Sequence, residues 1–376
     1  DLSVISADVS YDSRKETFST ESGVSFKAER LSGSSINLSY DVAEKKLILE
    51  KEVEMTILPS IEEALPIQIK SESFEYISGI KKGIFAGGVY LERDLDSAQA
   101  DIFEFKLVKS EERIRDATFR GNVRIVSISS PDAVEWESSY FRFPAERVEI
   151  EADELMFRGF PDSSVIHQVL ASGGGRFVFG GKAGESTEIR GEDIRFFFLR
   201  TGELREFSAV KEASLREKDG SGLEVRSLQG NRLMLKGPQS LLSADGSLQN
   251  QARYFSEDQE ITANSIKIDL EKSDLEAKEE FKMVISGEEK TPSGLFEQGK
   301  PIFITAGEMR YSDKNNRFIF KRDIKVWQDK QQLFGEEFTL NTETQEIRCS
   351  GNAKSVFVVK SGETGEDRRI GISADE

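Results

Sequence analysis

The sequence predicts an all-β fold, an elongated antiparallel β-jellyroll built from stacked hairpin repeats. The first observation behind this prediction is a short pattern that recurs nine times. An apolar residue is followed two positions later by a turn-type or polar residue, and then by two apolar residues separated by one. The copies occupy residues 49–55, 85–91, 119–125, 171–177, 209–215, 248–254, 277–283, 320–326 and 349–355. Recurrence of this kind is typical of a stacked array.

The second observation is a companion element upstream of many copies. It consists of a small residue, commonly an acidic or amide residue, and then two apolar residues separated by one. Examples are residues 100–105, 152–157, 191–196, 263–268, 306–311 and 335–340. Turn-type segments such as 312–316 separate these elements, and alternation with period two between turns predicts β-hairpins. Each repeat is therefore expected to be a pair of strands.

The third observation concerns the middle position of the repeat. The nine residues there are Lys51, Gly87, Gly121, Gly173, Lys211, Asn250, Glu279, Arg322 and Gly351. Four of them are glycine, which is expected where a strand bulges or bends sharply. A strand bent at this corner can serve two facing sheets, and we expect every second residue to face an apolar interior.

Composition agrees with a folded repeat protein. Of 376 residues 32% are charged, and 26 are phenylalanine, so polar and aromatic side chains must be sorted onto opposite strand faces. By repeat character we divide the chain into residues 1–126, a divergent stretch with an insertion at 127–258, and residues 259–376. The formal charge of −17 disfavours nucleic-acid partners, because binding to phosphates depends on Lys and Arg.

The cysteine content and the search for targeting signals say less about the function. The single cysteine, Cys349, excludes an internal disulfide, and its alternation with Ile347 predicts a buried, unreactive thiol. No apolar run has the length of a membrane helix, and the first residues lack the features of a signal peptide, so an exported protein would be present in a mature or trimmed form. Residues 370–376 resemble the opening of another repeat, so the chain is expected to stop inside one.

Several copies resemble a known family. The patterns Phe-x-Gly-Asn-Val-x-Ile at 119–125 and Phe-x-Gly-Gly-Val-x-Leu at 85–91, with the Ala-Asp openings, resemble the LptA/OstA-like family of periplasmic lipopolysaccharide-transport proteins. Residues 304–359 look closest to that family. The first portion, 1–126, is more similar to the related LptC type. The resemblance implies an open β-taco that holds lipid A acyl chains in its groove and joins neighbouring proteins end to end across the periplasm.

The resemblance therefore implies a non-enzymatic lipid carrier and bridge component in the periplasm, with no cofactor and no metal. Its partners would be lipopolysaccharide or a lipid A-like lipid, other OstA-like jellyrolls, and inner- and outer-membrane transport components. The inward apolar positions are candidates for the lipid groove. They are Phe103, Phe105, Phe119, Val123, Leu155, Phe157, Phe196, Ile266, Ile268, Phe281, Met283, Met309, Tyr311, Phe318, Phe320, Ile324, Val326, Phe338 and Leu340.

Two further expectations follow from a groove with open ends. Phosphates of lipid A would need a few basic residues near the groove mouth, and Lys321, Arg322 and Lys325 are candidates. Unpaired strand edges invite pairing with another chain, so residues 2–9 and 370–376 are places where a partner strand could add.

The sequence gives weaker support for a catalytic function than for a lipid carrier. His167 is the only histidine and lies in an ordinary strand pattern, so we expect a structural role for it. Carboxylate pairs are too common in this acidic chain to indicate glycoside chemistry. A polysaccharide-cleaving β-solenoid remains an alternative of a different class, although hairpins differ from the short parallel coils of that fold. The main alternative is a structural or adhesive β-repeat protein with a closed core.

Overall fold

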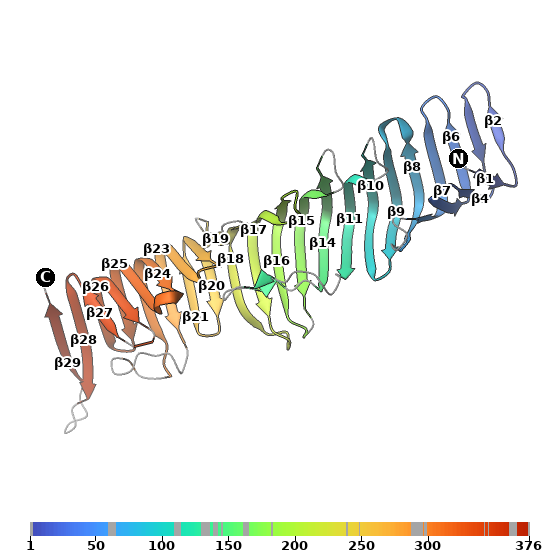
Figure 1. Cartoon of the computed structure of the whole chain (residues 1–376). Helices are drawn as coiled ribbons and strands as arrows, with labels where there is room; N and C mark the ends of the chain where they lie inside the picture. The colour runs from blue at the N-terminus through green and yellow to red at the C-terminus, as the bar shows by residue number, and fades with distance from the viewer. Residues whose placement is uncertain are drawn as a thin grey trace. The chain divides into compact units, whose positions relative to one another are not determined.

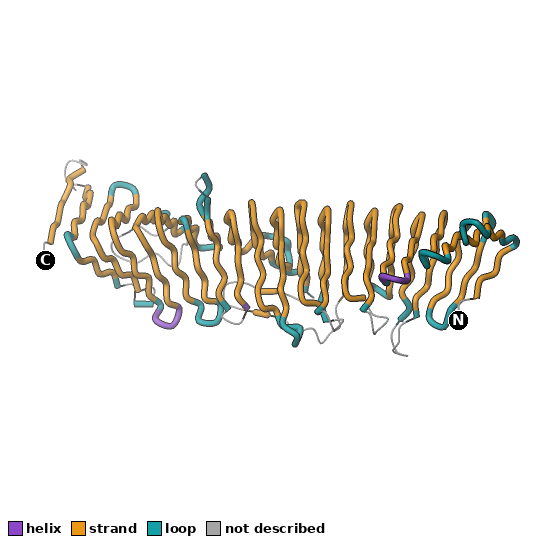
Figure 2. The backbone as a smooth tube through the Cα atoms, turned by 90° about the horizontal axis from the view of Figure 1, so that it is seen from above, coloured by secondary structure: helices purple, strands orange, loops and turns teal. Residues whose placement is uncertain are grey.

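The structure, a computed structural model, describes residues 3–58, 65–108, 114–128, 136–137, 142–143, 146–160, 165–181, 183–237, 240–247, 249–286, 296, 299–341, 343–344, 346–360 and 367–374. The regular elements in these ranges are β-strands and two short 3₁₀ helices, η1 (Ser78–Ile80) and η3 (Asp313–Asn315). Strand follows strand through short turns (Figures 1 and 2). Within these ranges, no helix is long and apolar enough to cross a membrane.

The strands of the first half of the chain are β1 (Ser3–Ser6), β2 (Ser10–Asp12), β3 (Thr17–Thr20), β4 (Val24–Lys27), β5 (Leu31–Ser35), β6 (Asn37–Asp41), β7 (Lys46–Ile57), β8 (Ile67–Ile77), β9 (Lys82–Arg93), β10 (Asp96–Leu107), β11 (Ile114–Ile128), β12 (Trp136–Glu137), β13 (Arg142–Phe143), β14 (Arg147–Gly159), β15 (Ile166–Gly180) and β16 (Ser186–Phe198). The remaining strands are β17 (Leu204–Lys218), β18 (Glu224–Lys236), β19 (Leu241–Asp245), β20 (Ala252–Ser256), β21 (Gln259–Ala263), β22 (Ser265–Asp269), β23 (Asp274–Ile285), β24 (Ile302–Ser312), β25 (Arg317–Gln328), β26 (Gln331–Asn341), β27 (Ile347–Ser350), β28 (Ala353–Lys360) and β29 (Asp367–Ala374).

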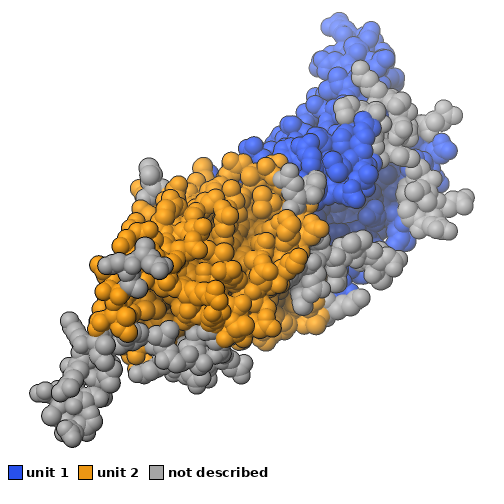
Figure 3. All heavy atoms as spheres, turned by 60° about the vertical axis from the view of Figure 1, so that its left-hand side comes forward, with its two compact units in different colours: residues 1–133, 145–179, 192–205 blue, residues 134–144, 180–191, 206–376 orange. Residues whose placement is uncertain are grey.

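The chain forms two compact units, coloured separately in Figure 3. Unit 1 comprises residues 1–133, 145–179 and 192–205, and unit 2 comprises residues 134–144, 180–191 and 206–376. The division by repeat character at residues 126 and 258 concerned the type of hairpin in each segment, and it stays a prediction.

In unit 1, the long strands serve two layers because their halves pair with different short strands. Residues 46–50 of β7 pair with β6, whereas residues 54–57 pair with β5. From β6 the pairing continues to β3 and β2, which we call layer A of unit 1. From β5 it continues to β4 and β1, which we call layer B. The strands β8, β9, β10, β11 and β14 continue both layers as antiparallel pairs.

Unit 2 is built in the same way. Residues 232–236 of β18 pair with β19, and residues 226–229 pair with β20. From β19 the pairing passes to β22 in layer A of this unit, and from β20 it passes to β21 in layer B. The two layers rejoin in β23, continue through β24, β25 and β26, and split again into β27 and β28, with β29 beside β28. The predicted antiparallel jellyroll of stacked hairpins is confirmed.

The corner between the layers lies where the repeat pattern predicts it. Eight of the nine corner residues have a positive φ, between +58° and +84°, and in each case the next residue also has a positive φ. In five of the long strands these two residues are skipped by the neighbouring strand, which shifts the register. A two-residue left-handed bulge therefore bends the strand from one layer into the other, which is the role predicted for the four glycines.

The companion element forms hydrogen bonds and close packing at these corners. The N–H groups of Ile36, Asn264 and Glu336 donate to the carbonyl oxygens of the corner residues Lys51, Glu279 and Gly351, at 3.1, 2.9 and 3.0 Å. Where the element contains Ala100, Ala152 or Ala263, the small side chain is buried. In the element Gly335-Glu336, the acidic side chain reaches the residue after the next corner, since Asn352 Nδ2 donates to Glu336 Oε1 at 2.7 Å. The small residue therefore fits the inner side of the bend, and the polar residue forms a hydrogen bond on its outer side.

The copy around Asn250 departs from the prediction of a continuous bent strand. Here β19 ends at Asp245 and β20 begins at Ala252, and the strand is interrupted. The Ser247 hydroxyl accepts the N–H groups of Gln249 and Asn250, at 3.4 and 3.1 Å, which closes a local turn. Because serine and asparagine stabilise such turns, the local structure replaces the bulge.

The interior is packed next to the corners. In unit 1 the rings of Phe74, Phe85, Phe103 and Phe119 stack across neighbouring strands, with centroid separations of 4.3, 6.0 and 4.5 Å. These four side chains are at most 6% exposed. In unit 2 the buried rings of Phe281, Phe320 and Phe338 form a similar row. Any accessible interior must therefore lie farther from the corner, toward the turns that end each layer.

Candidate functional site

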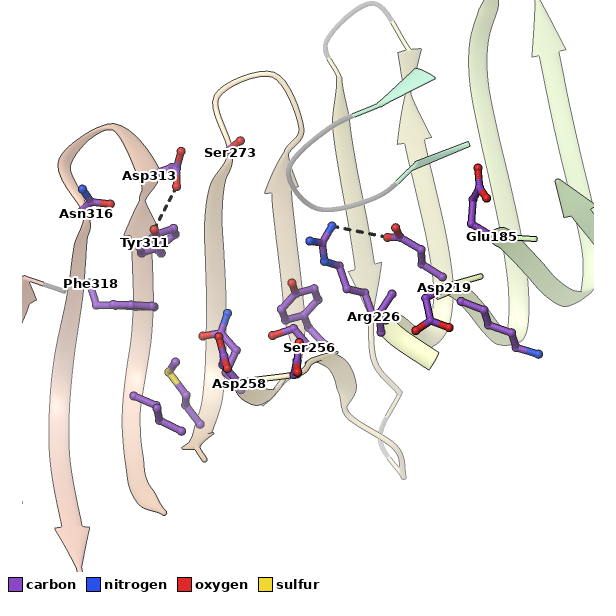
Figure 4. A pocket seen from close by; sticks show the side chains of 18 of the residues that line it. Glu185, Asp219, Arg226, Ser256, Asp258, Ser273, Tyr311, Asp313, Asn316 and Phe318 are labelled. Carbon is purple, nitrogen blue, oxygen red and sulfur yellow. Dashed lines mark hydrogen bonds and ion pairs between the residues drawn. The ribbon is translucent and has the colours of Figure 1, made fainter. Parts of the chain in front are cut away.

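A groove of about 990 Å³ opens between layers A and B of unit 2 (Figure 4). Its apolar and aromatic lining comes from both layers. Layer B contributes Tyr254 from β20 and Met283 and Ile285 from β23, whereas layer A contributes Tyr311 from β24, Phe318 from β25 and Leu340 from β26. Inward alternation along bent strands brings these side chains together from segments almost ninety residues apart.

The two tyrosines keep the floor of the groove uncharged. Burial raises the pKa of Tyr254 to about 12. Burial also raises the pKa of Tyr311 to about 12, and the Asp313 carboxylate adds to this effect. The Tyr311 hydroxyl donates to Asp313 Oδ1 at 3.2 Å. Both phenols are therefore neutral near pH 7.

Turns at the ends of the strands form the two rims. The layer B rim carries Glu185, Asp219, Glu257 and Asp258, and the layer A rim carries Ser273, Asp313, Asn316 and Glu343. Figure 4 shows Ser273, Asp313 and Asn316 at turns that close neighbouring hairpins. Across layer A, Asn316 Nδ2 donates to Glu343 Oε2 at 3.3 Å. The rims are polar, whereas the floor is not.

The rims are also strongly acidic. Seven carboxylates line the groove, against two cationic side chains, Lys218 and Arg226. Arg226 is already engaged, because its Nη1 lies 3.6 Å from Glu217 Oε2. The groove therefore combines an apolar floor with a negative mouth.

The structure places the nineteen predicted lipid-groove candidates at different depths. Sixteen are buried, namely Phe103, Phe119, Val123, Leu155, Phe196, Ile266, Ile268, Phe281, Met283, Met309, Phe318, Phe320, Ile324, Val326, Phe338 and Leu340. The other three, Phe105, Phe157 and Tyr311, are half-buried. Four of the nineteen line the groove of unit 2, namely Met283, Tyr311, Phe318 and Leu340. Their role as lipid contacts stays a prediction.

Sequence reasoning missed Tyr254 and Ile285 in the floor and all of the carboxylates at the rims. A signal for the floor was present, because Tyr254 ends the sixth copy of the repeat and Ile285 continues the alternation of Phe281 and Met283. For the rims there was none, because the carboxylates come from turns that are distant in sequence.

The three basic residues predicted at the mouth do not line the groove. Lys321 and Arg322 lie at the corner, where they approach Glu337 at 3.4 Å and Glu308 at 3.5 Å. The two-residue bulge at Arg322 and Asp323 fixes this position. The ammonium group of Lys325 lies 5.0 Å from the ring centroid of Trp327 and 5.9 Å from that of Phe334. Their predicted place at the mouth is wrong, because a residue beside the corner is far along the strand from the rim.

Other residues considered for chemistry have structural surroundings. The His167 ring contacts Phe160, with a centroid separation of 4.7 Å. The half-buried Cys349 thiol donates to the carbonyl oxygen of Phe334 at 3.4 Å, and burial raises the pKa of this thiol. In the described part of the chain, no group of three or more His, Cys, Asp or Glu side chains is placed to hold a metal ion.

The pairing pattern and the groove define a class of protein, an antiparallel β-jellyroll with an apolar groove between two layers. No family model matches the sequence, and no curated protein matches it. A similar solved structure is LptH, the LptA homologous periplasmic component of the conserved lipopolysaccharide transport device from Pseudomonas aeruginosa. The two chains are 12% identical, and the match covers 40% of this chain and 94% of that chain with a TM-score of 0.29.

Proposed function

We propose that this protein is a non-enzymatic periplasmic carrier, in which the groove of unit 2 shields the acyl chains of a lipopolysaccharide-like or lipid A-like lipid during transport to the outer membrane. The observation that carries the proposal is the apolar groove between the two layers. Its volume falls within the about 300–1,000 Å³ typical of ligand pockets. A saturated chain of a dozen carbons gains on the order of 9 kcal/mol on leaving water, at about 0.8 kcal/mol per methylene. The binding energy needs no catalytic group.

A charge placed in the groove tests this proposal. Ile285→Arg introduces a guanidinium among the apolar lining residues, and we expect the affinity for a fluorescent acyl probe with an uncharged headgroup to fall by about tenfold or more, since a charge in an apolar site is costly. Fluorescence titration of the purified protein measures the affinity. Mass spectrometry of lipids extracted from the same preparation identifies any copurifying cargo.

The matched control is Val284→Arg on the same strand. Val284 is half-buried like Ile285, but it lies on the outer face, opposite Phe303 of β24. We expect this variant to bind the probe as the unaltered protein does. Equal loss in both variants, or an unaltered protein that takes up no lipid, would instead favour a structural or adhesive repeat protein with a closed core.

We also propose that strand edges join this chain to other jellyroll proteins, as a bridge requires. In the described part of the chain, β1 pairs only with β4 and β29 pairs only with β28. Ile5 on β1 is 71% exposed and Ile372 on β29 is 59% exposed. Unpaired edges with exposed apolar side chains favour the addition of a partner strand.

Photocrosslinking tests the edges. A photoreactive amino acid in place of Ile5 or Ile372 is expected to give crosslinked oligomers of the purified protein. The same substitution at Leu95, which is 62% exposed in the turn between β9 and β10, serves as the control. Crosslinking that is equally strong from Leu95 would show that the contacts are not made through the edges.

A further inference from the structure

The groove of unit 2 carries a charge pattern that bears on its ligand. Seven carboxylates line the groove, and six of them lie on the rims, with Glu185, Asp219, Glu257 and Asp258 on one side and Asp313 and Glu343 on the other. A lipid whose acyl chain lies between the layers must place its headgroup between these rims. The sign of the rim charge therefore acts directly on the headgroup.

Hydrogen bonds hold the Asp219 carboxylate on the layer B rim in its charged form. Asp219 accepts hydrogen bonds from Ser221 Oγ at 2.7 Å and from the N–H groups of Ser221 and Leu223 at 2.9 and 3.0 Å. The hydrogen bond from the Ser221 side chain is the largest cause that lowers the pKa of Asp219. Bonds to the charged form of a carboxylate stabilise that form.

A second observation is that one rim carboxylate oxygen accepts no hydrogen bond from the described residues. The Oε2 atom of Glu185 is buried, and no donor among the described residues bonds to it. A buried carboxylate oxygen without a donor is costly, because it loses its hydration. A positively charged group between the rims would offset the charge of this carboxylate through space.

We infer that the groove of unit 2 selects amphiphiles whose headgroup carries a positive charge, such as an amine-bearing lipid, over amphiphiles with the same chain and an anionic headgroup. This inference rests on the acyl-chain part of the proposed function, and it narrows the cargo to a lipid A-like lipid whose headgroup carries amines, because the acidic rims repel unmodified phosphate groups. It adds the class of headgroup. The apolar floor binds the acyl chain, and the acidic rims select the headgroup by its charge.

The physical basis is the interaction of unit charges across the mouth. Opposite unit charges attract and like unit charges repel across the mouth, and salt screens the exposed part of this interaction. Several carboxylates together give a large difference between a cationic and an anionic headgroup. The difference must decrease as ionic strength rises.

Three probes with one decyl chain test the inference on the full protein. Decyltrimethylammonium, decyl maltoside and decyl phosphate are titrated below their micelle concentrations by isothermal calorimetry, with circular dichroism as a check of folding. We expect decyltrimethylammonium to bind about tenfold more tightly than decyl phosphate at low salt, with the maltoside between them, and the ratio to decrease in added salt.

Two double variants locate the effect. Glu257→Gln with Asp313→Asn neutralises one carboxylate on each rim, and we expect this variant to lower the ratio about threefold. Glu279→Gln with Glu280→Gln removes the same charge at the corner of β23, away from the rims, and should leave the ratio nearly unchanged. The corner variant controls for the net charge of the chain.

The outcomes separate the inference from the proposed function. If the maltoside and phosphate probes bind as tightly as the ammonium probe, the headgroup inference is wrong while the groove still carries a chain. An equal change in the corner variant would also overturn it, because the selectivity would not come from the rims. If none of the three probes binds, the proposed function itself fails.

Discussion

Phe85→Ala is expected to lower the free energy of unfolding of unit 1 by about 3–5 kcal/mol, the range measured for truncation of large buried aromatic residues. Phe85 is fully buried in β9. Its ring lies 4.3 Å from that of Phe74 and 6.0 Å from that of Phe103. The layers meet at the corner beside this ring, so the neighbouring strands cannot close the cavity without breaking their pairing. The loss combines the apolar surface returned to water with the contacts forfeited around the void.

The measurement is amide hydrogen exchange in β8, β9 and β10, followed by urea unfolding. In a stacked array each hairpin is stabilised by its neighbours, so the loss should appear in all three strands. Ile80→Ala is the control, because Ile80 lies close by in η1 but is 60% exposed. We expect that variant to change stability by less than about 0.5 kcal/mol. If Phe85→Ala were equally mild, the stacked rings would not form the core of unit 1.

The repeat pattern predicted the fold class and the corners because both are local. Alternation with period two fixes which face of a strand a residue occupies, and a turn-type residue within it marks the bend. The same reasoning failed at Asn250, where the Ser247 hydroxyl forms a competing turn. A short pattern reports the inward direction of a side chain, but not whether a local turn interrupts the strand.

The groove was only partly predictable for a different reason. Alternation assigns Phe320 and Phe318 to the same inward face, yet Phe320 packs against other rings beside the corner whereas Phe318 lines the groove. The two rings differ in their distance from the bend. The layers diverge with that distance, and this divergence decides whether a ring packs or lines the groove. The charge of the rims depends on Asp219, Asp258 and Asp313, which lie in three turns distant in sequence. Only the stacking order of the hairpins brings them to one mouth.

The corner at Arg322, which lacks glycine, is the reverse of the four glycine corners. At Gly87, Gly121, Gly173 and Gly351 an added Cβ would meet the side chain of an acidic residue on the neighbouring strand of the same sheet. Glu72 on β8, beside Gly87 on β9, is an example. Arg322 occupies a corner without glycine, and there the residue on the neighbouring strand is Gly307, whose own added Cβ would lie 2.9 Å from the Arg322 Cβ. The corners at Lys51 and Glu279 have Ile36 and Asn264 at the equivalent place, so the exchange is particular to Arg322, where the neighbouring strand provides the space. A short corner segment read alone does not reveal which strand does so.

Gly87→Ala is accordingly expected to lower the stability of unit 1 by about 2–4 kcal/mol, and Gly88→Ala by about 1 kcal/mol. Both residues have a positive φ, +84° and +65°, so each alanine bears the left-handed strain. Only at Gly87 would the new Cβ lie 2.4 Å from the Glu72 Cβ, whereas nothing lies within 4 Å at Gly88. Urea unfolding of the two variants separates strain from close approach.

A double-mutant cycle then tests whether the glycine at this corner can be moved to the neighbouring strand. Glu72→Gly in the Gly87→Ala background recreates the arrangement of Arg322 and Gly307, with the glycine moved to the neighbouring strand. We expect a favourable coupling of about 1–2 kcal/mol between the two substitutions, as for residues in direct contact. Additive effects would mean that the cost at Gly87 is backbone strain alone, and glycine at this corner would then be required for its φ and not for the close approach of the two strands.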